Sequence, residues 1–278
     1  MLVNLKEILK IAEAEGCAVG SFNTPNFASL KAVISAAEEL RKPVIIMHAE
    51  VHEEMGLCKI DEIIPIMLFM ADKASVPVCV HLDHGTNLDY IARGLKLGCT
   101  SVMYDGSTLP EKINEANTGI AVSMAKRFGA SVEAEIGSMG TRESGEQTDE
   151  SIYTDPEAAK RFVDNTGIDA LACAFGTAHG IYLKKPKLDF DRLAEIKERV
   201  DVPLVMHGGS GVSHEDYQRV IELGIRKINY YTYMSKAGGK AVCDLHDKTF
   251  FHDIEVAAIA AMNNDVKTAI EIFGKVSE

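Results

Sequence analysis

Short apolar runs alternate with amphipathic segments along the whole chain. The segment Phe27–Leu40 repeats apolar side chains every three to four positions, and the apolar run Pro43–His48 follows it. Alternation of this kind is typical of parallel βα units, in which helices cover the sheet that the strands build. The pattern predicts eight strands: Ala18–Phe22, Pro43–His48, Pro77–Leu82, Thr100–Tyr104, Ser131–Ile136, Ala170–Phe175, Pro203–His207 and Lys227–Tyr230.

An X-Pro step marks three of the expected strand starts. The pairs are Lys42-Pro43, Val76-Pro77 and Val202-Pro203. Because the residue before a proline avoids the helical region, each pair ends the preceding helix and favours an extended chain.

The eight βα units follow one another without a linker. A closed (β/α)8 TIM barrel requires this number, whereas an open doubly wound sheet usually stops near about six strands. We therefore predict one (β/α)8 barrel domain over residues 1–278, in which residues 232–278 form a C-terminal helical extension. The polar, glycine-containing segment Gly137–Asp155 is long for a βα loop and predicts a lid over the barrel mouth.

Composition narrows the class of protein. With 46% hydrophobic and 25% charged residues, the chain is typical of a soluble globular protein. Its net charge of −12 argues against a nucleic-acid or anionic membrane surface, since such surfaces need clustered Lys and Arg. The six cysteines form no CxxC pair, and we recognise neither an export signal nor a membrane span. We expect a reduced, cytoplasmic protein.

Histidines follow three of the expected strands. His84, His179 and His207 come at or just after strand ends, where TIM barrels build their active sites. One such histidine is most simply a hydrogen-bonded loop residue, but three imidazoles with an open fourth position are a ligand set for catalytic zinc. We expect His48 to be packed or solvated, and the remaining loop and C-terminal histidines to lie at the surface: His52, His214, His246 and His252.

Carboxylates accompany these histidines. Asp83 precedes His84 and is expected to act as a general acid and base, or alternatively to orient a metal-bound histidine. Asp105 and Glu135 end the fourth and fifth strands. They could hold a second cation or transfer protons, and a salt bridge to a rim Lys or Arg is the structural alternative.

A glycine-rich turn follows the seventh strand. Gly208-Gly209-Ser210-Gly211 precedes a helix that is expected to begin near Ser213, and such turns present backbone N–H groups to anions. The alternative is that the glycines only allow a tight turn, but the loops after the last strands of TIM barrels commonly bind phosphate. Asn229 and Thr232, at the end of the eighth strand, could complete a phosphate site.

Taken together, the motifs GSFNTPN, HLDHG, GTAHGIY, HGGSG and KIN..T resemble the class II fructose-bisphosphate and tagatose-bisphosphate aldolase family. The resemblance implies Zn2+ held by His84, His179 and His207, proton transfer by Asp83, and a possible monovalent cation. It implies reversible retro-aldol cleavage of a ketose phosphate that releases dihydroxyacetone phosphate, and a homodimer or homotetramer. The family's second-cation positions match Asp105 and Glu135, and the substrate or phosphate positions match Asn23, Gly180, Gly208, Gly209, Ser210, Asn229 and Thr232.

Three segments depart from the family pattern. The lid reads Gly140-Thr141-Arg142-Glu143-Ser144, so that Glu143 or Glu146 would replace the usual lid acid. The eighth-strand motif, usually Asn followed by small residues and Thr, is here Asn229-Tyr230-Tyr231-Thr232-Tyr233, and these tyrosines could reshape the phosphate site or pack outward. His48-Ala49-Glu50-Val51 replaces a segment that usually contains Ser or Gly.

These departures suggest a ketose phosphate other than fructose 1,6-bisphosphate, with Arg142 binding an anionic group on the aldehyde half. A non-catalytic phosphosugar-binding barrel and a zinc hydrolase are the competing hypotheses.

Overall fold

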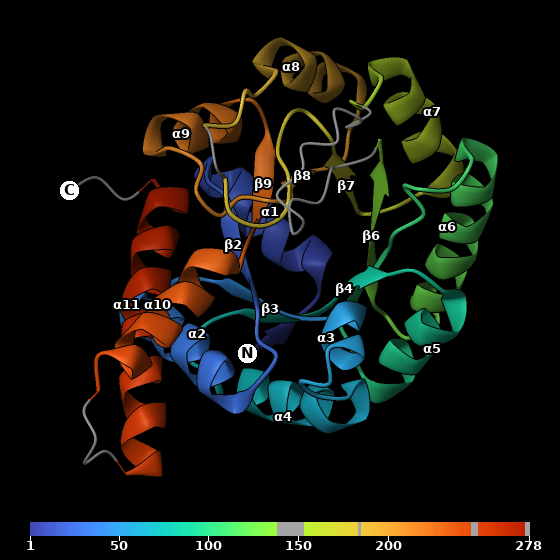
Figure 1. Cartoon of the computed structure of the whole chain (residues 1–278). Coiled ribbons are helices and arrows are strands. Elements are labelled where there is room, and N and C mark those ends of the chain that lie inside the picture. Colours follow the sequence, from blue (N-terminus) through green and yellow to red (C-terminus); the bar gives the residue numbers. More distant parts are fainter. Residues whose placement is uncertain (138–152, 183–184, 246–249, 276–278) are drawn as a thin grey trace.

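The computed structural model describes residues 1–137, 153–182, 185–245 and 250–275 (Figure 1). Eight parallel strands, β2 to β9, form a closed barrel because β4 pairs with both β3 and β5. The (β/α)8 prediction is confirmed. The strands are β1 Leu2–Val3, β2 Val19–Asn23, β3 Val44–Ala49, β4 Val78–Gly85, β5 Ser101–Tyr104, β6 Ser131–Ile136, β7 Ala170–Cys173, β8 Leu204–Met206 and β9 Ile225–Tyr230.

Helices surround the barrel on its outside (Figure 1). They are α1 Leu5–Glu15, α2 Phe27–Leu40, α3 Glu50–Glu54, α4 Ile60–Lys73, α5 Leu88–Leu97, α6 Glu111–Lys126, α7 Pro156–Thr166, α8 Phe190–Arg199, α9 His214–Glu222, α10 Thr232–Cys243 and α11 Phe251–Phe273. None of the helices in the described part of the chain is long and apolar enough to cross a membrane.

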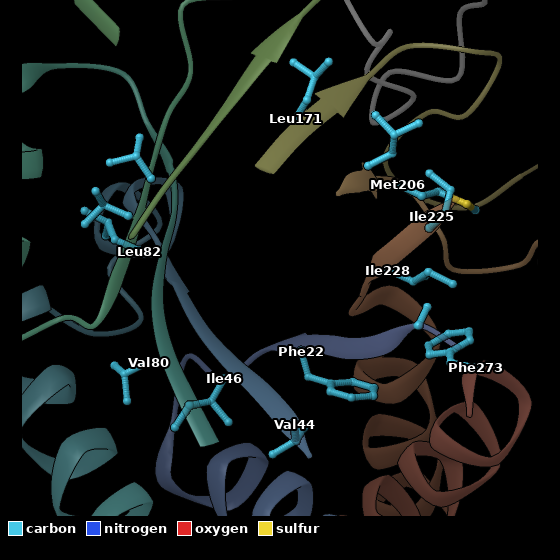
Figure 2. Close-up of a cluster of buried hydrophobic side chains, with 14 of the residues drawn as sticks. Phe22, Val44, Ile46, Val80, Leu82, Leu171, Met206, Ile225, Ile228 and Phe273 are labelled. Carbon is cyan, nitrogen blue, oxygen red and sulfur yellow. The ribbon is translucent and has the colours of Figure 1, made fainter. Parts of the chain in front are cut away.

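Two hydrophobic layers follow from the alternation of side chains along each strand. Outward-facing residues such as Ile46, Val80 and Ile228 pack beneath the surrounding helices (Figure 2). Inward-facing residues, including Met47 and Cys79, pack against the apolar face of α1. Helix α1 therefore closes the N-terminal end of the barrel, and the polar residues at the other end remain available for a site.

The sequence pattern did not predict the amino-terminal strand β1. It pairs with the start of β4, Leu2 with Val78 and Val3 with Cys79, whereas the β4–β5 pairing begins only at His81. A two-residue strand has no alternation of its own for a sequence pattern to reveal.

The last helix completes the ring. Helix α11 packs against α2 and α9 and contacts β2, with Phe273 fully buried against Tyr217 and Tyr230. The predicted C-terminal helices are therefore present, and α11 occupies the eighth helix position of the barrel. All six cysteines are free.

Candidate metal centre and acid-base site

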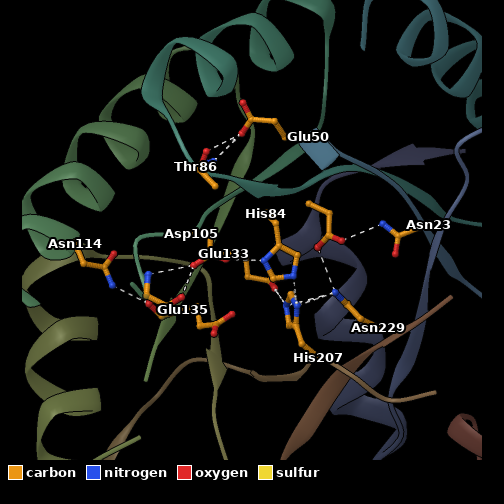
Figure 3. A network of polar contacts seen from close by, with 12 residues as sticks. Asn23, Glu50, His84, Thr86, Asp105, Asn114, Glu133, Glu135, His207 and Asn229 are labelled. Atoms are coloured by element: carbon orange, nitrogen blue, oxygen red, sulfur yellow. Dashed lines mark hydrogen bonds and ion pairs between the residues drawn. The ribbon is translucent and has the colours of Figure 1, made fainter. Parts of the chain in front are cut away.

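Three histidines from three different elements meet at the C-terminal end of the barrel. The ring centre of His84 lies 4.6 Å from that of His207 and 5.0 Å from that of His179. One ring nitrogen of each histidine lies within 4.8 Å of the others. Figure 3 shows His84 and His207 facing each other. The histidines that sequence spacing singles out thus converge on one point.

An irregularity in β4 directs His84 into this cluster. Neighbouring side chains of a regular strand point to opposite faces, so Asp83 and His84 could not both face the site. The pairing of β4 with β5 shifts register between Leu82 and Gly85, and His84 has a φ of 46°. A left-handed non-glycine residue at a bulge is a strained feature that is enriched at functional sites.

Carboxylates fix the two closest imidazoles. His84 Nδ1 is 2.7 Å from Asp105 Oδ2, and His207 Nε2 is 2.7 Å from Glu133 Oε1. A ring N–H bonded to a carboxylate leaves the other nitrogen as an acceptor. Those other nitrogens, His84 Nε2 and His207 Nδ1, lie 2.8 Å apart. Two lone pairs at this distance require a shared proton or a cation beside them, so the donor set fits a metal ion.

The charge states agree with this interpretation. Burial alone would lower the pKa of His84, but the Asp83, Asp105 and Glu135 carboxylates raise it to about 10. Burial and its two neighbouring histidines lower the pKa of His179 to about 3. The carboxylates that hold a proton on His84 would equally favour a metal ion in place of that proton, and His179 is neutral, as a metal ligand must be.

Asp83 lies beside the cluster with both oxygens hydrogen-bonded. Asn23 Nδ2 donates to Oδ2 at 3.0 Å and Asn229 Nδ2 donates to Oδ1 at 3.2 Å. Burial opposes its ionisation, but His84, His207 and Lys227 hold its pKa well below the usual range. Asp83 is thus an ionised carboxylate that is held in one orientation.

A second group of possible ligands shares His84. Its members are His84, Asp105 and Glu135, whose ligand atoms lie within 4.8 Å of one another. Burial and the nearby carboxylate of Asp105 raise the pKa of Glu135 well above its usual value. None of the described residues donates a hydrogen bond to Glu135 Oε2, which leaves it available to a cation or a proton.

The glycine-rich turn after β8 packs against the start of α10. Ser210 Oγ accepts hydrogen bonds from the backbone N–H groups of Tyr231 at 3.1 Å and Thr232 at 3.2 Å. Gly209 N–H donates to the carbonyl oxygen of Asn229 at 3.1 Å. Ser210 and Thr232 therefore meet as expected, whereas the side chain of Asn229 points to Asp83 and His207.

Tyr182 joins the two loops that carry His179 and His207. Its hydroxyl accepts from Ala178 N–H at 2.8 Å and donates to the Gly208 carbonyl at 2.9 Å. Gly208 has a φ of 63°, and a Cβ there would lie 2.4 Å from the Ala178 carbonyl oxygen. The two ligand loops therefore touch through backbone atoms, and Gly180 lies in the first of them with a φ of 95°.

Sequence reasoning missed several polar residues inside the barrel. Glu133 and Lys227 are fully buried and form an ion pair with 3.0 Å between Lys227 Nζ and Glu133 Oε2. The available signal was a charged residue inside each of two buried strands.

The prediction for His52 was wrong, because its ring is buried and only 4% exposed. His52 Nδ1 accepts from the Ala49 N–H at the start of α3, and its ring lies 5.7 Å from that of Tyr231. His48 is packed, as expected, with Nε2 3.1 Å from the Tyr90 hydroxyl.

Of the unusual tyrosines, Tyr230 packs outward, with its ring 5.9 Å from that of Phe22. Tyr233 lies against Gly211. The lid residues Arg142, Glu143 and Glu146 lie outside the described residues.

Comparisons of sequence and structure relate this chain to known aldolases. A family model described as fructose-bisphosphate aldolase class-II matches residues 3–278. The YdjI aldolase from Escherichia coli K12 is 35% identical, with a TM-score of 0.89 over 99% of this chain and 98% of that one.

Two further solved structures are similar. A Coccidioides immitis protein assigned as a fructose-1,6-bisphosphate aldolase is 27% identical, with a TM-score of 0.87 over 97% of this chain and 96% of that one. The fructose-bisphosphate aldolase of Campylobacter jejuni shares the fold at 20% identity, with a TM-score of 0.82 over 98% and 95% of the two chains. The chain therefore belongs to the class II fructose-bisphosphate aldolase family, whose members are metal-dependent lyases.

Proposed function

We propose that this protein is a zinc-dependent aldolase that reversibly cleaves a ketose phosphate into dihydroxyacetone phosphate and an aldehyde. The observation that carries the proposal is the convergence of His84, His179 and His207 beside the ionised carboxylate of Asp83. Imidazole nitrogens suit Zn2+, and three protein ligands with an open position are typical of catalytic sites.

His84, His179 and His207 would hold the zinc ion. When bound there, zinc supplies a Lewis acid that polarises the carbonyl of the ketose. Asp105 and Glu133 support this role because each accepts a hydrogen bond from a ligand histidine and so directs the other ring nitrogen toward the metal. Asp105 and Glu135 are the candidates for a second cation, which could be monovalent.

Asp83 would accept the proton of the substrate hydroxyl during cleavage and return it during condensation. Its buried position keeps water from competing, and Asn23 and Asn229 hold the carboxylate in one orientation. Proton return at the carbon atom would fall to the lid acid, for which Glu143 is our candidate and Glu146 the alternative.

The phosphate of the substrate would bind near Ser210 and Thr232. Ser210 Oγ caps the backbone N–H groups of Tyr231 and Thr232 at the start of α10, and the helix dipole favours an anion at that end. Gly180, Gly208 and Gly209 would let backbone approach the phosphate closely. This half of the site is common to any substrate that yields dihydroxyacetone phosphate.

For the other half, we propose a substrate other than fructose 1,6-bisphosphate. The supporting features are two departures from the family pattern: Arg142 in the segment predicted to form a lid, and Tyr231, whose ring lies 5.7 Å from that of His52. Arg142 would bind an anionic group of the aldehyde product. Equal kcat/KM values for Arg142→Ala and the parent across a panel of ketose phosphates would refute that role.

The decisive experiment measures metal content and dihydroxyacetone phosphate release together. The purified protein is assayed for zinc and then incubated with ketose 1-phosphates and ketose bisphosphates, with released product trapped enzymatically. We expect about one zinc ion per chain at the three-histidine site. We expect His84→Ala to lose both zinc and product release, and Asp83→Asn to lose product release alone.

A matched control is His214→Ala, because His214 is an exposed histidine at the start of α9. It should retain both zinc and turnover. Zinc bound without release from any member of the panel would instead favour a phosphosugar-binding protein.

We also propose that the chain assembles as a homodimer or homotetramer. Phe250 and Phe251 at the start of α11 are 69% and 85% exposed, which is unusual for neighbouring aromatic side chains of a monomer. Sedimentation equilibrium would test this, and a single monomeric species at micromolar concentration would contradict it.

A further inference from the structure

A lysine lies fully buried beneath the candidate site. Lys227 of β9 points into the barrel, where its ammonium contacts Asn229 Oδ1 at 2.6 Å and Glu133 Oε2 at 3.0 Å. Burying an ammonium group is costly unless hydrogen bonds compensate, and replacing a buried ion pair by apolar residues is often neutral for stability. Stability alone therefore gives little reason for a lysine at this position.

The contact with Asn229 has a directional consequence. The two ends of a side-chain amide have nearly the same shape, so packing does not decide which end points where. An ammonium group only donates hydrogen bonds, and it therefore selects the oxygen of Asn229. The amide nitrogen is then left facing Asp83 Oδ1 at 3.2 Å and His207 Nδ1 at 3.1 Å.

The opposite amide orientation would be harmful. It would turn Asn229 Oδ1 toward the Asp83 carboxylate, where two acceptors would repel each other. Asp83 would move or rotate, and its bond to Asn23 would no longer suffice to hold both oxygens. A displacement of about 1 Å of a reacting group can lower turnover by about a hundredfold.

We propose that Lys227 is a positioning residue that fixes the side-chain amide of Asn229 and thereby holds Asp83 in its reactive orientation. Lys227 acts through Asn229 and does not touch the reacting atoms. The consequence for turnover rests on the proposed aldolase function, whereas the orientation of the amide does not.

Removing Lys227 also leaves the charge of Glu133 without its ion-pair partner, and a control variant must separate this effect from the effect on Asn229. Lys227→Met leaves Glu133 buried with only its histidine contacts, and this variant could unfold for that reason alone. The double variant Lys227→Met with Glu133→Gln removes both charges and keeps a similar volume. Arg226→Gln is the matched control, because Arg226 lies next to Lys227 and its hydrogen bonds within the described part of the chain go to the carbonyls of Ile221 and Ile225.

The first measurement is hydrogen exchange of the Asn229 side-chain amide in the zinc-loaded protein, with the NMR signals identified by their absence from Asn229→Ala. We expect the proton directed at Asp83 to be protected in the parent and in Arg226→Gln. Protection should be lost in Lys227→Met and in the double variant. Unchanged protection in either lysine variant would overturn the proposal, even if the aldolase function itself proved wrong.

The second measurement is a double-mutant cycle on turnover. Lys227→Met should lower kcat by about tenfold to a hundredfold with a smaller change in KM, since Asp83 acts in the chemical step. Combining it with Asn229→Ala should cost no more than Asn229→Ala alone. Fully multiplicative losses would show that Lys227 does not act through Asn229. Absence of turnover in the parent would instead refute the proposed function and leave the exchange experiment to decide.

Discussion

Tyr182→Phe tests whether the two ligand loops are held together before metal binds. The change removes a hydroxyl that accepts from Ala178 N–H at 2.8 Å and donates to the Gly208 carbonyl at 2.9 Å, and it keeps the ring. A hydrogen bond contributes about 0.5–1.5 kcal/mol, so the two bonds sum to about 1–3 kcal/mol. Because Tyr182 is only half-buried, water can replace part of this. We expect a loss of about 1–2 kcal/mol in the free energy of unfolding.

Zinc affinity should fall as well, for a separate reason. If the loops of His179 and His207 move apart in the metal-free variant, zinc binding must bring them together again. This costs at most the free energy that the two Tyr182 hydrogen bonds contributed. A cost of about 1.4 kcal/mol corresponds to about a tenfold weaker affinity, which chelator competition can measure. Urea denaturation of the metal-free protein measures the change in the free energy of unfolding independently.

The control for this prediction is Tyr90→Phe. The Tyr90 hydroxyl also has two partners, Glu53 and His48, but it joins α5 to α3 and contacts neither ligand loop. It should lower stability with little change in zinc affinity. If both variants left zinc affinity equally unchanged, other contacts would fix the two loops, and the role given to Tyr182 would be wrong.

Four further outcomes are expected. Asp83→Asn should lower kcat by roughly a hundredfold to ten-thousandfold without loss of zinc, as measured by turnover and metal content. Removing zinc with a chelator should lower the melting temperature measured by calorimetry, because a ligand at about a thousand times its Kd stabilises the folded state by about 4 kcal/mol. Gly208→Ala, which drives a Cβ against the Ala178 carbonyl, should weaken zinc binding in chelator competition, whereas Gly119→Ala in α6, with no atom near its Cβ, should not. Burial raises the pKa of Asp265, with a smaller opposing effect from Tyr230. The folded protein therefore binds this proton more tightly than the unfolded chain does. Its free energy of unfolding falls as pH rises through the interval between the unfolded and folded pKa values. Asp265→Asn should reduce that slope in urea denaturation above about pH 4, and an unchanged slope would contradict the assignment.

Local patterns determined much of this protein from the sequence. Strands buried on both faces read as apolar runs, and X-Pro steps mark where three of them begin, so the barrel could be predicted from periodicity. Parallel strands also place their carboxyl ends on one face, which is why His84, His179 and His207 could be grouped although they are far apart in the chain.

Other features depended on contacts that no local pattern encodes. Alternation along a strand sends Asp83 and His84 to opposite faces, and only the register shift against β5 and the left-handed backbone of His84 bring both to the site. Likewise, Glu133 and Lys227 have no opposite charge in their own strands and become an ion pair only when the barrel brings β6 and β9 to face each other across its interior. The sequence thus determined which elements form and which ends carry chemistry. Tertiary structure decided how the buried charges pair and which way each side chain points, because the cost of burying a charge depends on partners that are distant in sequence.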